Sequence, residues 1–127
     1  MVIHLGDGED DLGLAIQELP AFRNKPVLQV RGNCDPRGLQ EGLIENIAGY
    51  RFYITHGHMH RVKSGIYTLL EDAKQIDRNV VLFGHTHCQF LEEYDGIYLF
   101  NPGAVKDLNY GLITIDEKTG DIEFEHI

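Results

Sequence analysis

The feature that most constrains this sequence is a pattern that occurs four times, in which an apolar run ends in a glycine turn carrying a metal-capable side chain. The four turns are Leu5-Gly6-Asp7, Arg31-Gly32-Asn33, Thr55-His56-Gly57-His58 and Phe83-Gly84-His85-Thr86-His87. Short apolar runs bounded by such turns predict buried strands. Strand ends on one edge of an open α/β sheet share a crevice. The pattern therefore predicts an α/β fold with a polar site where four strands end.

Hydrophobic periodicity predicts the remaining elements. Strands are expected over residues 1–5, 26–31 and 79–83, helices over 9–19 and 64–76, and hairpins over 43–55, 89–100 and 108–126. Asn101-Pro102-Gly103 reads as a turn. Strands that alternate with helices early and form hairpins late indicate one layered α/β domain over residues 1–127, with mixed sheets.

Composition and charge exclude several classes of protein. The chain has 127 residues, of which 43% are hydrophobic, so it can bury a core without disulfides. It has two cysteines and a net charge of −9, which argue against a disulfide scaffold and against binding duplex nucleic acid. Neither a membrane-spanning run nor an N-terminal signal segment is present, so we expect a cytoplasmic protein without a membrane partner.

The side chains at the four turns suit a transition metal. Imidazole nitrogen combined with carboxylate and amide oxygen favours Zn, Mn or Fe over Ca or Mg. Each motif alone is weak, because Gly6-Asp7 or Gly32-Asn33 is most often a simple turn. The alternative is a set of polar turns that only close strands. All four in this order, however, indicate a metal site.

The ordered motifs resemble those of the calcineurin-like metallophosphoesterases. The matching segments are Gly6-Asp7, Gly32-Asn33-Cys34-Asp35, Thr55-His56-Gly57-His58, Gly84-His85-Thr86-His87 and Asn101-Pro102-Gly103. The chain is most similar to the small YfcE-like phosphodiesterase branch, where Gly-Asn-Cys-Asp replaces the more common Gly-Asn-His-Asp or Glu. The resemblance covers essentially the whole chain. It implies a four-layer α/β/β/α sandwich with two metals at the strand ends.

The resemblance also implies a role for each candidate ligand. Asp7 would bridge two divalent metals, with Asn33, His56 and His85 completing the shell of the second and His87 binding the first. Mn, Zn, Fe and Ni all suit these ligands, and Mn is favoured. The implied activity is hydrolysis of a phosphodiester or small phosphomonoester by a metal-bridged hydroxide.

The sequence departs from the family at its N-terminus. Family members carry an Asp-x-His before the residue that corresponds to Asp7, and the printed sequence has none. The first strand and helix are therefore expected to be missing. Either Met1 is an internal methionine, which we prefer, or the chain is shortened. We expect these 127 residues to bind at most one metal well, with weak or absent phosphodiesterase activity, and unpaired strand edges to favour a homodimer or instability.

Three residues are candidates for contact with the substrate. Cys34 stands where common family members have a general-acid histidine, so a preference for good leaving groups is expected. The alternative interpretation is that Cys34 is a small buried residue without a chemical role. Asp35 either orients Cys34 or caps the loop, and His58 either faces the substrate phosphate or lies in solvent.

The remaining residues of interest have structural interpretations. His4 is expected to be a hydrogen-bonded core residue, His60 and His126 to lie on the surface, Cys88 to pack, and Asn101 and Gly103 to shape the floor of the site. The alternative function is a non-catalytic metal-binding or protein-interaction module, because a membrane-trafficking coat subunit shares this fold with a degraded metal site.

Overall fold

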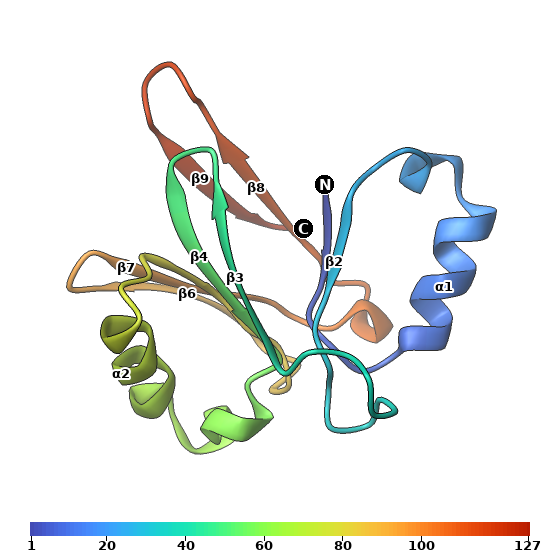
Figure 1. Ribbon diagram of the computed structural model, residues 1–127, viewed down its shortest axis with the longest axis horizontal. Coiled ribbons are helices and arrows are strands. Elements are labelled where there is room, and N and C mark those ends of the chain that lie inside the picture. The colour runs from blue at the N-terminus through green and yellow to red at the C-terminus, as the bar shows by residue number, and fades with distance from the viewer.

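The computed structural model describes residues 1–127, except the side chain of Glu9 (Figure 1). The strands are β1 (Val2–His4), β2 (Val27–Gln29), β3 (Gly42–Ile47), β4 (Tyr50–Thr55), β5 (Val80–Leu82), β6 (Gln89–Tyr94), β7 (Ile97–Pro102), β8 (Gly111–Ile115) and β9 (Ile122–His126). The α-helices are α1 (Glu9–Glu18) and α2 (Tyr67–Gln75), and 3-10 turns are η1 (Pro20–Phe22), η2 (His58–His60), η3 (Val62–Ser64) and η4 (Val105–Asp107).

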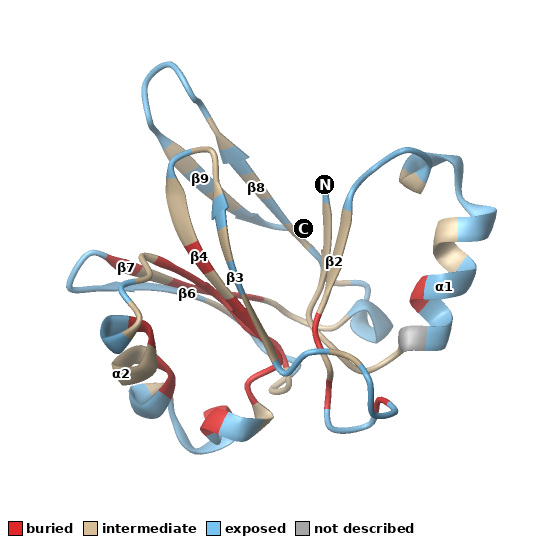
Figure 2. Cartoon of the chain, viewed as in Figure 1, coloured by how far each residue is buried: buried red, intermediate tan, exposed pale blue. Residues whose placement is uncertain are grey.

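A five-stranded mixed sheet with the order β3-β4-β5-β7-β6 forms the centre of the fold. β4, β5 and β7 are parallel, and β3 and β6 pair antiparallel to their hairpin partners. Because side chains alternate along a strand, Val81 faces the core that contains Leu69 of α2, whereas Val80 and Leu82 face the opposite core. All three β5 residues are buried, and Figure 2 shows that buried residues follow this central region.

Two strand pairs cover the face of the central sheet opposite α2. β1 and β2 are parallel and β8 and β9 are antiparallel. Ile3, Leu28, Ile113 and Phe124 from these pairs pack against the same core. α1 lies on the outer side of β2, where Leu12 is buried. The predicted α/β/β/α sandwich is therefore confirmed, although the second β layer consists of two separate pairs in the described residues.

Three predicted boundaries are wrong for local reasons. The helix expected from Ser64 begins at Tyr67, because Gly65 has φ 134°, which a helix cannot contain. Leu108 lies in a left-handed turn rather than a strand, with φ 62°. Asn101 and Pro102 complete β7 instead of forming a turn, which proline permits at the end of a strand.

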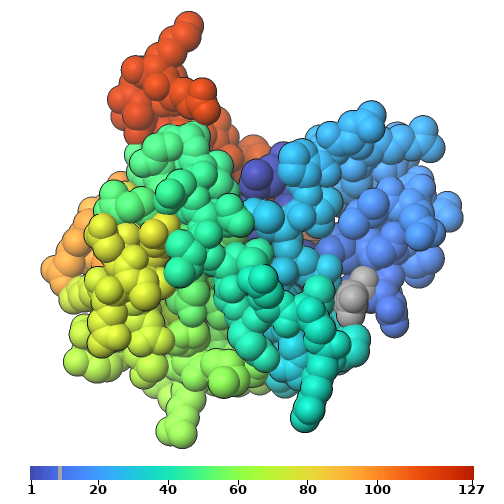
Figure 3. Space-filling view, viewed as in Figure 1, coloured from blue at the N-terminus to red at the C-terminus, as the bar shows by residue number. Residues whose placement is uncertain are grey.

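The outline of the molecule is uneven. The turn of the β8–β9 hairpin projects beyond the other elements (Figure 3).

No helix in the described part of the chain combines the length and apolar character that crossing a membrane requires.

Candidate metal centre

Four of the predicted ligands meet around one atom, Nε2 of His56. It lies 3.1 Å from Nδ1 of His85 and 3.2 Å from Oδ1 of Asn33. Oδ2 of Asp7 is 3.4 Å away. Ligand atoms of Asp7, His56 and His85 all lie within 4.8 Å of one another. The structure thus brings together, from four segments of the chain, the set that the sequence assigned to one metal.

The hydrogen bonding of His56 shows which ring nitrogen is available. Its Nδ1 is 2.6 Å from the carbonyl oxygen of Leu5. A carbonyl oxygen only accepts, so Nδ1 carries the hydrogen and the neutral ring presents a lone pair at Nε2. That lone pair faces the oxygens of Asn33 and Asp7. Lone pairs that converge on one point attract a cation.

Burial favours the neutral form of the two histidines of the cluster. Burial lowers the pKa of His56. The Leu5 carbonyl and the charge of Asp7 raise it, but the effect of burial is larger. Burial also lowers the pKa of His85, and the nearby His56 lowers it further. Neutral imidazole is the form that binds metals, so both rings are suited to that role near neutral pH.

Close backbone packing explains the glycines of two motifs. A Cβ added to Gly6 would lie 2.6 Å from Nδ1 of His56, and one added to Gly32 would overlap Asp7. Asp7 and His85 have φ 59° and 66°, a left-handed conformation that non-glycine residues rarely adopt. Such conformations concentrate at functional sites, where the surroundings hold them in place.

Asp35 holds the backbone of the loop that carries Asp7. Its Oδ2 accepts hydrogen bonds from the backbone N–H groups of Asp7 at 2.7 Å and Gly32 at 2.8 Å, and its Oδ1 accepts one from Gly8 at 3.0 Å. The carboxylate is buried. These contacts favour the loop-capping interpretation over orientation of a thiol.

Cys34 and His58 lie on either side of the cluster. Cys34 is exposed, so the buried interpretation is wrong, and its N–H donates to Oδ1 of Asp7 at 2.8 Å. The side chain of His58 is only 14% exposed, and its ring centroid is 5.2 Å from that of His56. His58 therefore lies beside the candidate metal centre rather than in open solvent.

Asn101 supports the turn that carries His85. Its side chain is fully buried, at 0% exposure, and donates to the carbonyl oxygen of Gly84 and to Oγ1 of Thr86. Its Oδ1 accepts from the N–H of Gly103. Asn101 therefore anchors the turn that carries His85, and its role in the floor of a site stays a prediction.

His87 lies outside the cluster. It is exposed and has φ 60°, and the cluster of metal-capable groups among the described residues does not include it. Cys88 beside it is also exposed, so its predicted packing role is wrong. The first metal position implied by the resemblance therefore retains only Asp7 and the exposed His87 among the described residues.

The other histidines differ in part from expectation. His60 is buried, with Nε2 2.9 Å from Asp72 and 3.3 Å from the hydroxyl of Tyr53, so its predicted surface position is wrong. His126 is exposed as predicted, but its ring stacks on Phe100. His4 is half-buried, accepts a hydrogen bond at Nδ1 and has a pKa lowered by burial.

Sequence reasoning missed Glu41, which contacts two segments that border the cluster. Its Oε1 is 2.8 Å from Nη1 of Arg31, and its Oε2 is 3.4 Å from Nε2 of His58. Arg31 directly precedes the Gly32-Asn33 motif and could have been singled out for that reason. No motif marks Glu41.

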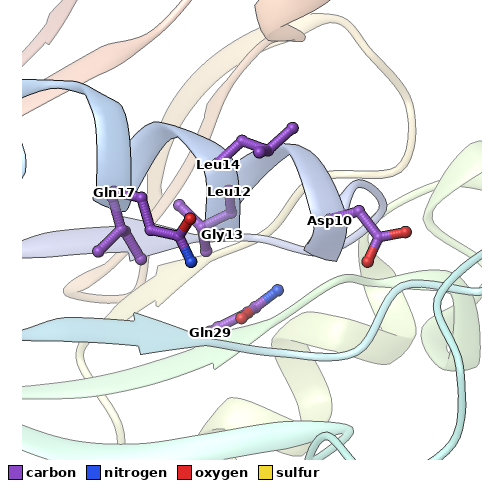
Figure 4. A pocket seen from close by; sticks show the side chains of 7 residues that line it. Asp10, Leu12, Gly13, Leu14, Gln17 and Gln29 are labelled. Carbon is purple, nitrogen blue, oxygen red and sulfur yellow. The ribbon is translucent and has the colours of Figure 1, made fainter.

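One cavity in the described chain lies away from the cluster. It has about 570 Å³, lies between α1 and β2, and is lined by Leu12, Ile16 and Gln29 among others (Figure 4). A second cavity of about 240 Å³ is lined by Gly8, Cys34 and Asp35, which adjoin the segments that carry Asp7 and Asn33.

Comparison with known proteins gives one family match. The model of the calcineurin-like phosphoesterase superfamily domain matches residues 1–118. The "Probable metallophosphoesterase YsnB" of Bacillus subtilis is 27% identical over 131 residues, covering 98% of this chain and 73% of that protein. "Phosphodiesterase YfcE" of Escherichia coli is 29% identical over 109 residues, covering 71% of this chain and 53% of YfcE. The chain thus spans about half the length of YfcE.

Solved structures share the fold. A single mutant of Vps29 from Entamoeba histolytica superposes with a TM-score of 0.79 and 22% identity, covering 99% of this chain and 80% of that one. Wild-type Vps29 from the same organism, complexed with Zn²⁺, superposes with a TM-score of 0.71 and 20% identity, covering 94% and 76%. At these identities the likeness concerns the fold alone.

Proposed function

Because this chain belongs to the calcineurin-like phosphoesterase superfamily, we propose that it is a metal-dependent hydrolase of phosphate esters, of the phosphodiesterase type. The observation that carries the proposal is the convergence of Asp7, Asn33 and His85 on the Nε2 lone pair of His56. The relatives that are named as phosphoesterases support the same reaction class.

The donor set fits one divalent transition metal. Two imidazoles, a carboxylate and an amide oxygen suit Mn, Zn, Fe or Ni, and we favour Mn. Zinc in the Vps29 structure shows that this fold can accept such an ion. Asp7, Asn33, His56 and His85 would hold it. When bound, the cation would supply Lewis acidity and lower the pKa of water.

The protein groups around the cluster would orient the ligands and the substrate. The carbonyl of Leu5 fixes the ring of His56, and the N–H of Cys34 holds one oxygen of Asp7. Asp35 accepts hydrogen bonds from the backbone of Asp7 and of Gly32, and so holds these two loops together. Cys34 and His58 would flank a phosphate ester at this position. A thiol is a weaker proton donor than imidazole near neutral pH, so esters with good leaving groups are the proposed substrates.

We propose that these 127 residues bind one cation and turn over slowly. The described ligands complete one shell, whereas His87 is exposed and lies outside it. Two-metal catalysis uses a second cation to stabilise the leaving oxygen. Without that stabilisation, hydrolysis would proceed mainly with activated esters.

The fold also supports a second candidate, a non-catalytic metal-binding or interaction module. The fold likeness to Vps29, a vacuolar protein sorting protein, favours it. An interaction module would bind its partner with or without metal, whereas a hydrolase would need the metal ligands.

Hydrolysis of bis(p-nitrophenyl) phosphate in Mn²⁺ separates these functions. Asp7→Asn keeps the side-chain shape but removes the charge. Asp95→Asn is the matched control, because Asp95 pairs with Lys74 on the surface. We expect measurable hydrolysis by the wild type and the control, with loss of hydrolysis and of bound metal in Asp7→Asn. Equal activity in the two variants would exclude the proposed site.

We also propose a cytoplasmic location and a phosphorylated small-molecule substrate. Both cysteines are free thiols, which a reducing compartment preserves. Self-association is proposed because several strands have an unpaired edge in the described chain, among them β3 and β6. Sedimentation equilibrium would give the mass of a homodimer, and a monomer mass at all concentrations would refute it.

A further inference from the structure

Two segments that supply metal ligands are connected by one residue outside the metal-binding motifs. Arg31 lies two residues before Asn33 and pairs with Oε1 of Glu41 at 2.8 Å. His58 lies two residues after His56, and its Nε2 is 3.4 Å from Oε2 of Glu41. One carboxylate therefore joins the ends of β2 and β4, where these two ligands emerge.

The backbone of the same segment reinforces the connection. The carbonyl oxygen of Glu41 accepts a hydrogen bond from Oγ1 of Thr55 at 3.1 Å. The carbonyl oxygen of Gln40 accepts one from the N–H of Arg31 at 2.8 Å. Glu41 thus has a fixed position relative to both strands, although its side chain is about half exposed.

The contact with Glu41 also distinguishes the two nitrogens of His58. An ionised carboxylate only accepts, so with Oε2 of Glu41 3.4 Å from Nε2 the neutral ring is favoured in the tautomer that carries its hydrogen on Nε2. Nδ1 is then left with a lone pair, and it is buried without a partner among the described residues. Histidines at metal sites commonly depend on an acceptor at one nitrogen to fix the other.

We propose that Glu41 is a positioning residue of the metal centre, which fixes the tautomer of His58 and holds the segments of Asn33 and His56 together. In that tautomer the Nδ1 of His58 is a hydrogen-bond acceptor rather than a donor, and it has no partner among the described residues. The role of His58 rests on the proposed function, because it requires that the candidate metal centre is the site where substrate binds.

Ring ¹⁵N chemical shifts of histidine test the tautomer directly, because protonated and unprotonated nitrogens differ strongly. The spectra would be recorded on the full metal-free chain at pH 8, where neutral imidazole is the ordinary form. We expect the Nε2–H form of His58 in the wild type and in Glu45→Gln, the matched control on β3. In Glu41→Ala we expect a mixture or the Nδ1–H form. A wild-type Nδ1–H form, or an unchanged tautomer in Glu41→Ala, would overturn the proposal.

Mn²⁺ titration tests the connection between the ligand segments. We expect Glu41→Ala to weaken Mn²⁺ binding about tenfold, and Glu41→Gln, which retains an acceptor oxygen, to recover part of that loss. Affinities equal to that of Glu45→Gln in both variants would contradict it. Neither the ¹⁵N shifts nor the Mn²⁺ affinity requires turnover. A chain that shows both effects but hydrolyses no ester would therefore refute the proposed hydrolase function and still support the proposed role of Glu41. Glu41→Gln also serves if Glu41→Ala fails to fold.

Discussion

Replacing Asn101 with alanine should lower the free energy of unfolding by about 3 kcal/mol. The side chain is fully buried and makes three hydrogen bonds, with the Gly84 carbonyl at 3.1 Å, Thr86 Oγ1 at 3.0 Å and the Gly103 N–H at 2.9 Å. A typical intramolecular hydrogen bond contributes about 1 kcal/mol net. Because the partners are left in a largely dry environment, the full loss of about 3 kcal/mol is expected.

Urea unfolding of the metal-free chain at pH 8 measures this effect. Asn46→Ala is the matched control, because Asn46 is exposed and accepts a single hydrogen bond from Arg78 at 2.9 Å. The control should change stability by less than about 0.5 kcal/mol. In a thermal melt, Asn101→Ala should lower Tm by roughly 10 °C. If both variants lose the same small amount, Asn101 does not support the His85 turn as described.

Further predictions concern the close packing at Gly32, the buried ring of His60 and the effect of pH. Gly32→Ala should abolish metal binding in a titration, because the added Cβ would overlap the ligand Asp7. A Cβ added at Gly13 of α1 meets nothing within 4 Å, so Gly13→Ala should keep metal binding and raise the free energy of unfolding in urea by about 0.5–1 kcal/mol. Equal metal affinity in the two variants would refute this. His60→Ala should lower the free energy of unfolding by about 1–3 kcal/mol, because the buried ring loses its contacts with Asp72 and Tyr53, and a change below about 0.5 kcal/mol in urea would contradict it. Burial lowers the pKa of His56, so the unfolded chain binds the proton more readily. Stability of the metal-free chain should therefore be complete above pH 6.5 and fall at lower pH in melts, whereas an increase on acidification would show the opposite sign.

The sequence was sufficient to predict that Asp7, Asn33, His56 and His85 lie together, because each follows an apolar run at a glycine turn and the four turns occur in order. A buried strand such as β5 ends at Gly84, and the side chain that follows has little freedom in where it can point. The close approach of Gly32 to Asp7 makes the glycine itself part of the signal. Candidate ligands that directly follow a buried strand can therefore be predicted from a single sequence.

Contacts between distant surface groups could not be predicted in the same way. His60 appears polar and loop-bound in sequence, yet α2 brings Asp72 to it and β4 brings Tyr53. Glu41 precedes an edge strand, and no periodicity indicates that it meets Arg31 and His58. Such contacts depend on how helices and loops pack, which residue patterns do not specify.

The central claim is that one cation binds at Nε2 of His56, and anomalous diffraction from a crystal grown with Zn²⁺ tests it most directly. The account predicts one strong peak about 2.0–2.1 Å from that nitrogen, within reach of Asp7, Asn33 and His85. A peak at His60 and Asp72 instead, or no peak at full zinc loading, would contradict it.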